Sequence, residues 1–115
     1  MTYYMMTGRY SAEALRGMAE KCEDRTEALT KALAAFGGKV DRYFMALDGL
    51  EFLLIAELRD NTAAMAFSSI VMRSGTVLEF KTTPLMAMSK MPDVLRVANE
   101  ATREYRPAGV SKIVP

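Results

Sequence analysis

Hydrophobic and polar positions in the first third of the chain indicate a strand followed by a long helix. Residues 2–10 are rich in tyrosine and other β-compatible residues, and they predict a strand that ends before Ser11, a suitable helix N-cap. Apolar residues then recur at helical spacing. This spacing predicts a helix over residues 12–36, with a kink or break near residues 20–24, where the apolar pattern weakens. The glycine pair at 37–38 predicts the end of this helix, because glycine readily adopts the left-handed conformation found there.

The middle of the chain has the pattern of a β-hairpin. Two β-rich runs, Lys39–Leu47 and Glu51–Leu58, flank Asp48-Gly49. Asp-Gly between such runs predicts a two-residue type I′ turn, because both central residues of that turn need positive φ. The turn sets the register of the strands, and it places four predicted pairs on one face: Ala46–Glu51, Phe44–Leu53, Arg42–Ile55 and Val40–Glu57.

A second helix and a fourth strand follow the hairpin. Apolar positions at helical spacing predict a helix over Asn61–Arg73, and the β-rich run Thr76–Leu85 predicts the strand. Strict alternation along this strand places Val77, Glu79 and Lys81 on the same face.

The order of these elements predicts a ferredoxin-like α+β fold. Strand, helix, strand, strand, helix, strand (βαββαβ) fits one antiparallel sheet of order 4-1-3-2, with both helices on one face. A third helix is predicted over residues 89–105. We therefore expect one domain over residues 1–105 and an irregular tail over residues 106–115, which proline and glycine interrupt.

One face of the predicted sheet has no helix to cover it. Its central residues are apolar, and they form a patch too large for comfortable exposure in a monomer. A second copy of the same sheet is the expected cover, so the chain is predicted to form at least a dimer. The predicted interface residues are Val40, Phe44, Leu53 and Ile55.

Charge and hydropathy narrow the classes of partner. Fifteen Lys and Arg residues nearly balance 14 Asp and Glu residues, which leaves a formal net charge of +1. That charge is too small for a general attraction to nucleic acid or to acidic membranes. The third predicted strand is acidic and aliphatic, unlike the strands that stack RNA bases. No apolar stretch is long enough to span a bilayer, and the N-terminus lacks a signal-peptide pattern, so a cytoplasmic location is expected.

Two features of composition exclude familiar chemistries. The chain has no histidine, which rules out histidine-dependent catalysis. Cys22 is the only cysteine, so an intrachain disulfide and a structural zinc site are excluded, and we expect a buried, inert thiol. We expect no metal and no cofactor.

Several short segments together carry a family resemblance, namely Tyr3-Tyr4, Gly37-Gly38-Lys39, the apolar strand 52–56 and Ser74-Gly75-Thr76-Val77. Over roughly residues 2–95 the chain resembles the GYD family of the dimeric α/β-barrel superfamily. In the segment that gives the family its name, Glu51 keeps the acid, while Asp48 and Leu50 stand where the family has glycine and tyrosine. The resemblance implies a dimeric ferredoxin-like fold and brings no established activity, although the wider superfamily includes cofactor-independent monooxygenases and isomerases.

Charged residues at the ends of the open face are the candidate ligand-binding residues. In a dimer they would line a cleft, where Arg or Lys would hold the polar or anionic end of a small, mainly apolar ligand. The alternative interpretation is that they form cross-strand or intersubunit ion pairs. The candidates are Arg9, Arg42, Glu51, Glu79 and Lys81.

Two hypotheses for function follow. The first is a homo-oligomeric domain that is non-catalytic or binds a small apolar or aromatic ligand. The second is a cofactor-independent enzyme, similar to a monooxygenase or an isomerase, that acts on a small hydrophobic or aromatic substrate. The character of the cavity separates them, because an enzyme needs an enclosed pocket with convergent polar groups.

Overall fold

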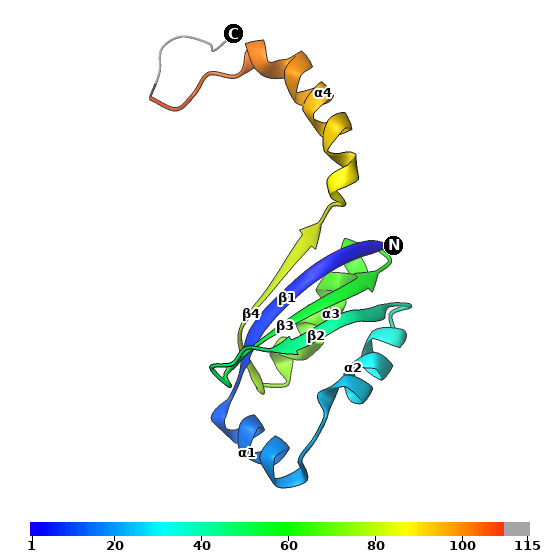
Figure 1. Ribbon diagram of the computed structural model, residues 1–115, viewed down its shortest axis with the longest axis vertical. Helices are drawn as coiled ribbons and strands as arrows, with labels where there is room; N and C mark the ends of the chain where they lie inside the picture. The colour runs from blue at the N-terminus through cyan, green and yellow to red at the C-terminus, as the bar shows by residue number, and fades with distance from the viewer. Residues whose placement is uncertain (110–115) are drawn as a thin grey trace. The chain divides into compact units, whose positions relative to one another are not determined.

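The computed structural model describes residues 1–109 and divides into two compact units (Figure 1). The first unit is residues 1–85, and the second begins at Met86. The prediction of one domain over residues 1–105 stays a prediction. The elements of the first unit are β1 (Thr2–Tyr10), α1 (Ala12–Lys21), α2 (Arg25–Ala34), β2 (Lys39–Met45), β3 (Glu51–Leu58), α3 (Asn61–Arg73) and β4 (Val77–Leu85).

The four strands form one antiparallel sheet in the order β2-β3-β1-β4. This confirms the predicted order 4-1-3-2 and the ferredoxin-like α+β fold. The sheet of the single chain is open, with β2 and β4 at its edges (Figure 1).

The helices α1, α2 and α3 pack on one face of this sheet. Leu33 of α2 and Phe67 of α3 belong to the main buried cluster of the core. Leu15 and Met18 of α1 pack on a smaller cluster around Phe52. A hydrogen bond of 2.7 Å from the Tyr4 hydroxyl to the Asn61 side chain satisfies a polar group at the edge of the core. The fully buried residues are Tyr4, Met6, Leu33, Leu54, Ala56 and Leu58.

The predicted helix over residues 12–36 is two helices with a sharp break between them. Cys22 adopts the left-handed conformation (φ 47°), and the Glu23 N–H returns to the Met18 carbonyl at 3.0 Å, which ends α1. Asp24 then caps α2 by accepting the Thr26 N–H at 2.9 Å. Cys22 is therefore exposed, and the prediction of a buried thiol is wrong. The physical reason is that the break turns the side chain out of the helical stripe on which it was placed.

Cys22→Gly should raise the free energy of unfolding by about 0.5 to 1 kcal/mol, because an L-residue is strained at positive φ and glycine is not. Urea denaturation of wild type and variant measures this effect. Cys22→Val is the contrasting variant, and a β-branched residue should lower stability there. A Cys22→Gly protein less stable than wild type would contradict the argument.

The β2–β3 turn differs from the predicted type I′ turn, but it preserves most of the register. Of its two central residues only Gly49 has positive φ (75°). The Asp48 carboxylate instead accepts the N–H groups of Leu50 and Glu51 at 2.9 and 3.2 Å, and these bonds lower its pKa. A four-residue connection between Ala46 and Glu51 gives the same pairing as the shorter turn. The predicted pairs Phe44–Leu53 and Arg42–Ile55 are therefore confirmed.

A β-bulge at Asp41 changes the register at the start of β2. Val40 pairs with Ala56, and Arg42 pairs with Ile55, so Asp41 is the extra residue. The predicted pair Val40–Glu57 is wrong, because the extra residue turns Val40 to the helix-covered face. There Val40 packs against the main core, and its predicted place on the open face is wrong as well.

A second irregularity lies between β1 and β4. Thr7 pairs with Lys81, but Arg9 pairs with Leu78, so β4 carries an extra residue here. Glu79 has a positive φ of 53°, the conformation found in one class of bulge. The predicted strict alternation is wrong at this point. Val77 is buried on the helix side, and Leu78, 51% exposed, lies on the open face.

The second unit is mainly helical over its described residues. It consists of η1 (Met88–Lys90), α4 (Met91–Ala101) and η2 (Thr102–Glu104), close to the predicted helix over residues 89–105. Residues 106–109 lie in no helix or strand, and the rest of the predicted tail lies outside the described residues, so the irregular tail over residues 106–115 stays a prediction. None of the helices in residues 1–109 has both the length and the apolar character needed to cross a membrane.

Candidate functional site

A cavity of about 370 Å³ lies within the first unit, on the helix-covered face of the sheet. Helices α1, α2 and α3 and all four strands contribute to its walls. Met18 and Leu29 line it from the first two helices, Phe67 lines it from α3, and Phe52 and Phe80 line it from the sheet. Its walls are therefore mainly apolar and aromatic.

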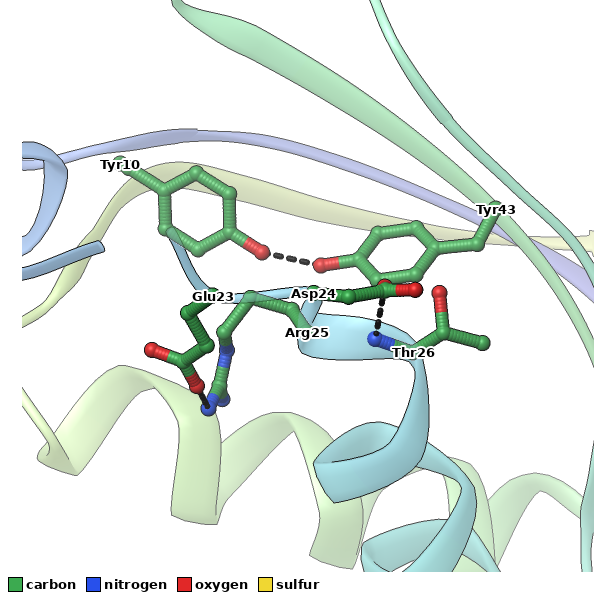
Figure 2. Close-up of polar contacts among 6 residues, drawn as sticks. All are labelled: Tyr10, Glu23, Asp24, Arg25, Thr26 and Tyr43. Carbon is green, nitrogen blue, oxygen red and sulfur yellow. Dashed lines mark hydrogen bonds and ion pairs between the residues drawn. The ribbon is translucent and has the colours of Figure 1, made fainter. Parts of the chain in front are cut away.

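Two tyrosines bring their hydroxyl groups together at one end of this cavity. A hydrogen bond joins the Tyr10 hydroxyl, at the end of β1, to the Tyr43 hydroxyl of β2 (Figure 2). Phe52 of β3 lies between the two strands and contacts both rings, with centroids 4.9 Å from Tyr10 and 6.0 Å from Tyr43. Packing against one buried phenylalanine thus fixes where both hydroxyls point.

The turn between α1 and α2 places charged side chains beside these tyrosines (Figure 2). Arg25 donates to Glu23 at 2.9 Å, and this bond raises the pKa of Arg25. The bond from Thr26 lowers the pKa of Asp24, which stays ionised as the cap of α2. The break at residues 22–24 is therefore what carries Arg25 to the polar end of the cavity.

A second, shallower cavity of about 230 Å³ adjoins the same tyrosines. It lies between the α1–α2 turn and the end of β2, where Phe44 and Met45 contribute to its wall. Tyr10, Arg25 and Tyr43 line both cavities. The hydroxyl pair therefore stands at the boundary that the two cavities share.

The Tyr43 hydroxyl stays protonated, so it can donate or accept a hydrogen bond and is not an anion. Burial raises its pKa well above the usual range for tyrosine, and the hydrogen bond with Tyr10 raises it further. Each neutral phenol has one O–H hydrogen, and the bond between the two hydroxyls uses one of these hydrogens. The pair therefore retains one hydrogen that can be donated to an oxygen of a bound molecule.

Most of the ligand-binding residues predicted from the sequence lie outside the two cavities, on the open face of the sheet. Arg9 and Glu51 face each other across β1 and β3 on the open face, and Arg42 and Lys81 lie on the same face. None of these four lines either of the two cavities described above. Glu79 lies in the β4 bulge. A ligand-binding role for these five residues stays a prediction.

Three residues of the site, Tyr10, Arg25 and Tyr43, were missed from the sequence. Tyr10 and Tyr43 fall within the predicted strands over residues 2–10 and 39–47, and nothing in a strand pattern shows that two hydroxyls from different strands meet. A usable signal was the charged run Glu23-Asp24-Arg25, which interrupts the apolar stripe of the predicted helix. Such a run predicts a turn at a helix junction, and a turn is a common place for binding residues.

The described residues contain no cluster of three or more acidic or cysteine side chains that would hold a metal ion. The arrangement is thus an apolar cavity with a neutral hydroxyl pair and one ion pair at its polar end.

Comparison with known protein families gives a match over most of the chain. A family model described as "GYD domain" matches residues 4–95, a range that includes both cavities and the tyrosine pair. No curated protein matches the sequence.

Proposed function

The chain belongs to the GYD family, and from this premise we propose that its first unit binds a small, mainly apolar molecule between the sheet and helices α1, α2 and α3. The observation that carries the proposal is the cavity of about 370 Å³ with aromatic walls and a polar end. Sites for small molecules have this character, with volumes of roughly 300 to 1,000 Å³ and a few polar groups that fix orientation.

Helix α1 offers a direct way to fill the cavity. Gly17 lines it, and a Cβ added at Gly17 would meet no atom within 4 Å. The side chain of Gly17→Phe therefore starts in open space, and we expect its ring to occupy the cavity. We expect this variant to lower the affinity for a bicyclic aromatic ligand by about tenfold or more.

Calorimetry and ligand-observed NMR with naphthalene derivatives measure this affinity. Ala19→Phe is the matched control, since it adds the same ring to an exposed position of α1 outside the cavity walls. Equal loss of binding in both variants would contradict the assignment of the cavity. Conversion of a bound compound, followed by mass spectrometry after incubation, would extend the proposal from binding to catalysis.

The proposal has a second part, which is that two copies of the chain associate through the open face of the sheet. Exposed apolar side chains on this face support it, because α1, α2 and α3 all pack on the opposite face. Phe44 is 56% exposed, Leu78 is 51% exposed and Tyr3 is 43% exposed. Association with a second sheet would remove this surface from water and complete a dimeric α/β barrel.

A further inference from the structure

We infer that the cavity selects ligands whose polar end is an uncharged oxygen, such as a phenol, an alcohol or a ketone, in preference to carboxylates. The Tyr10–Tyr43 hydroxyl pair is the selecting element. This inference rests on the proposed function, because it concerns the ligand of the same cavity. It adds the chemical class of the ligand's polar end and names the two residues that recognise it.

The hydroxyl pair is suited to a neutral oxygen. The two phenols are joined by one hydrogen bond, which leaves one donor hydrogen and free lone pairs at the end of an apolar cavity. A phenol oxygen placed there both accepts and donates, so it leaves no buried polar group unpaired. A hydrocarbon of the same shape makes neither bond.

One ion pair and one exposed cation line this cavity. Arg25 is paired with Glu23, while Lys21 of α1 is exposed and so keeps its hydration. Asp24 lines only the second cavity. Arg25 already donates to Glu23 at 2.9 Å, so a carboxylate ligand would have to displace Glu23 or share its partner. Arg25 and Asp24 also have opposite electrostatic effects on the pKa of the Tyr43 hydroxyl.

An anion therefore gains little from this site and loses its hydration. Removing a carboxylate from water is far more costly than removing a hydroxyl, unless a free cation is there to receive it. A neutral oxygen has the smaller cost and still finds a hydrogen bond. The pairing of Arg25 with Glu23 and the hydroxyl pair thus favour the same class of ligand.

The test uses three probes with one ring system, namely naphthalene, naphthol and naphthoate, at neutral pH, where naphthol is uncharged and naphthoate is an anion. We expect wild type to bind naphthol about tenfold more tightly than either of the other two, a difference of about 1.4 kcal/mol. The double variant with Tyr10→Phe and Tyr43→Phe should abolish the preference for naphthol over naphthalene, because it removes both hydroxyls. Each single variant keeps one O–H group and should retain part of the preference. Thermal denaturation verifies that each variant is folded.

A charge variant tests the other half of the argument. Glu23→Gln frees Arg25 from its ion pair and should raise the affinity for naphthoate by about tenfold, while naphthol affinity changes little. Tighter binding of naphthoate than of naphthol by wild type would overturn the inference, as would a naphthol preference that survives in the double tyrosine variant. Binding of all three probes with equal affinity would overturn the inference alone. Failure of all three to bind would overturn the proposed function with it.

Discussion

Leu53→Arg should convert the proposed dimer to monomers, with a rise in the dimer dissociation constant of about 100-fold or more. Leu53 lies at the centre of the open face, between Phe44 on β2 and Thr7 on β1. Next along β3, Ile55 lies beside Met5 of β1. An arginine here would place an unpaired charge in the middle of an apolar sheet-to-sheet contact, where it would lose its hydration without gaining a partner.

Light scattering at micromolar concentration measures the effect, and circular dichroism verifies that the variant is folded. Met65→Arg is the matched control. Met65 is an apolar residue on α3 that is 71% exposed, so an arginine there should leave assembly unchanged. A wild-type monomer under these conditions would contradict the assembly proposal, and so would a Leu53→Arg protein that remains dimeric.

Gly38→Ala should destabilise the first unit by about 3 kcal/mol, a large value for the addition of one methyl group. A Cβ at Gly38 would lie 2.5 Å from a Leu58 methyl carbon, 2.7 Å from the Glu57 carbonyl oxygen and 3.3 Å from the Leu33 carbonyl oxygen. Two of these atoms belong to backbone and cannot move aside by changing a rotamer. The Gly38 N–H also donates to the Leu33 carbonyl at 2.9 Å, so the strand start is held against the end of α2.

Gly17→Ala is the matched control, and its effect should have the opposite sign. Gly17 lies in the middle of α1 with no neighbour within 4 Å of an added Cβ. Alanine there should stabilise the protein by about 0.5 to 1 kcal/mol, because it lowers the backbone entropy of the unfolded chain. Denaturant unfolding of the two variants and wild type measures both changes. A Gly38→Ala protein as stable as wild type would show that β2 can move away from α2 at little cost.

The register of β2 and β3 shows how far local reasoning extends. The pairing Phe44–Leu53 was correct although the turn type was wrong, because two-residue and four-residue connections centred on the same point give the same pairs. The pairing of Val40 was wrong because one extra residue, Asp41, shifts the strand. A strand pattern carries no signal for such an insertion when the residues on either side are all compatible with β structure.

The candidate site shows a different limit of prediction from the sequence. Arg9, Arg42 and Lys81 were chosen from the sequence because charged side chains on a strand are visible as a pattern, and they do lie on the open face. Tyr10 and Tyr43 are 33 positions apart, and each fits a strand by itself. Their meeting depends on the position of β3 between β1 and β2 and on Phe52, which both rings contact.

The sequence by itself determined the types and order of the elements, the order of the strands and the open apolar face. These follow from period, capping residues and turn residues, which act over a few neighbouring positions. Only the tertiary structure decided the two bulges, the exposure of Cys22 and the cavity with its tyrosine pair. Each of these features depends on how helices and strands pack against one another, which brings together residues distant in the chain. A local sequence pattern carries no information about that packing.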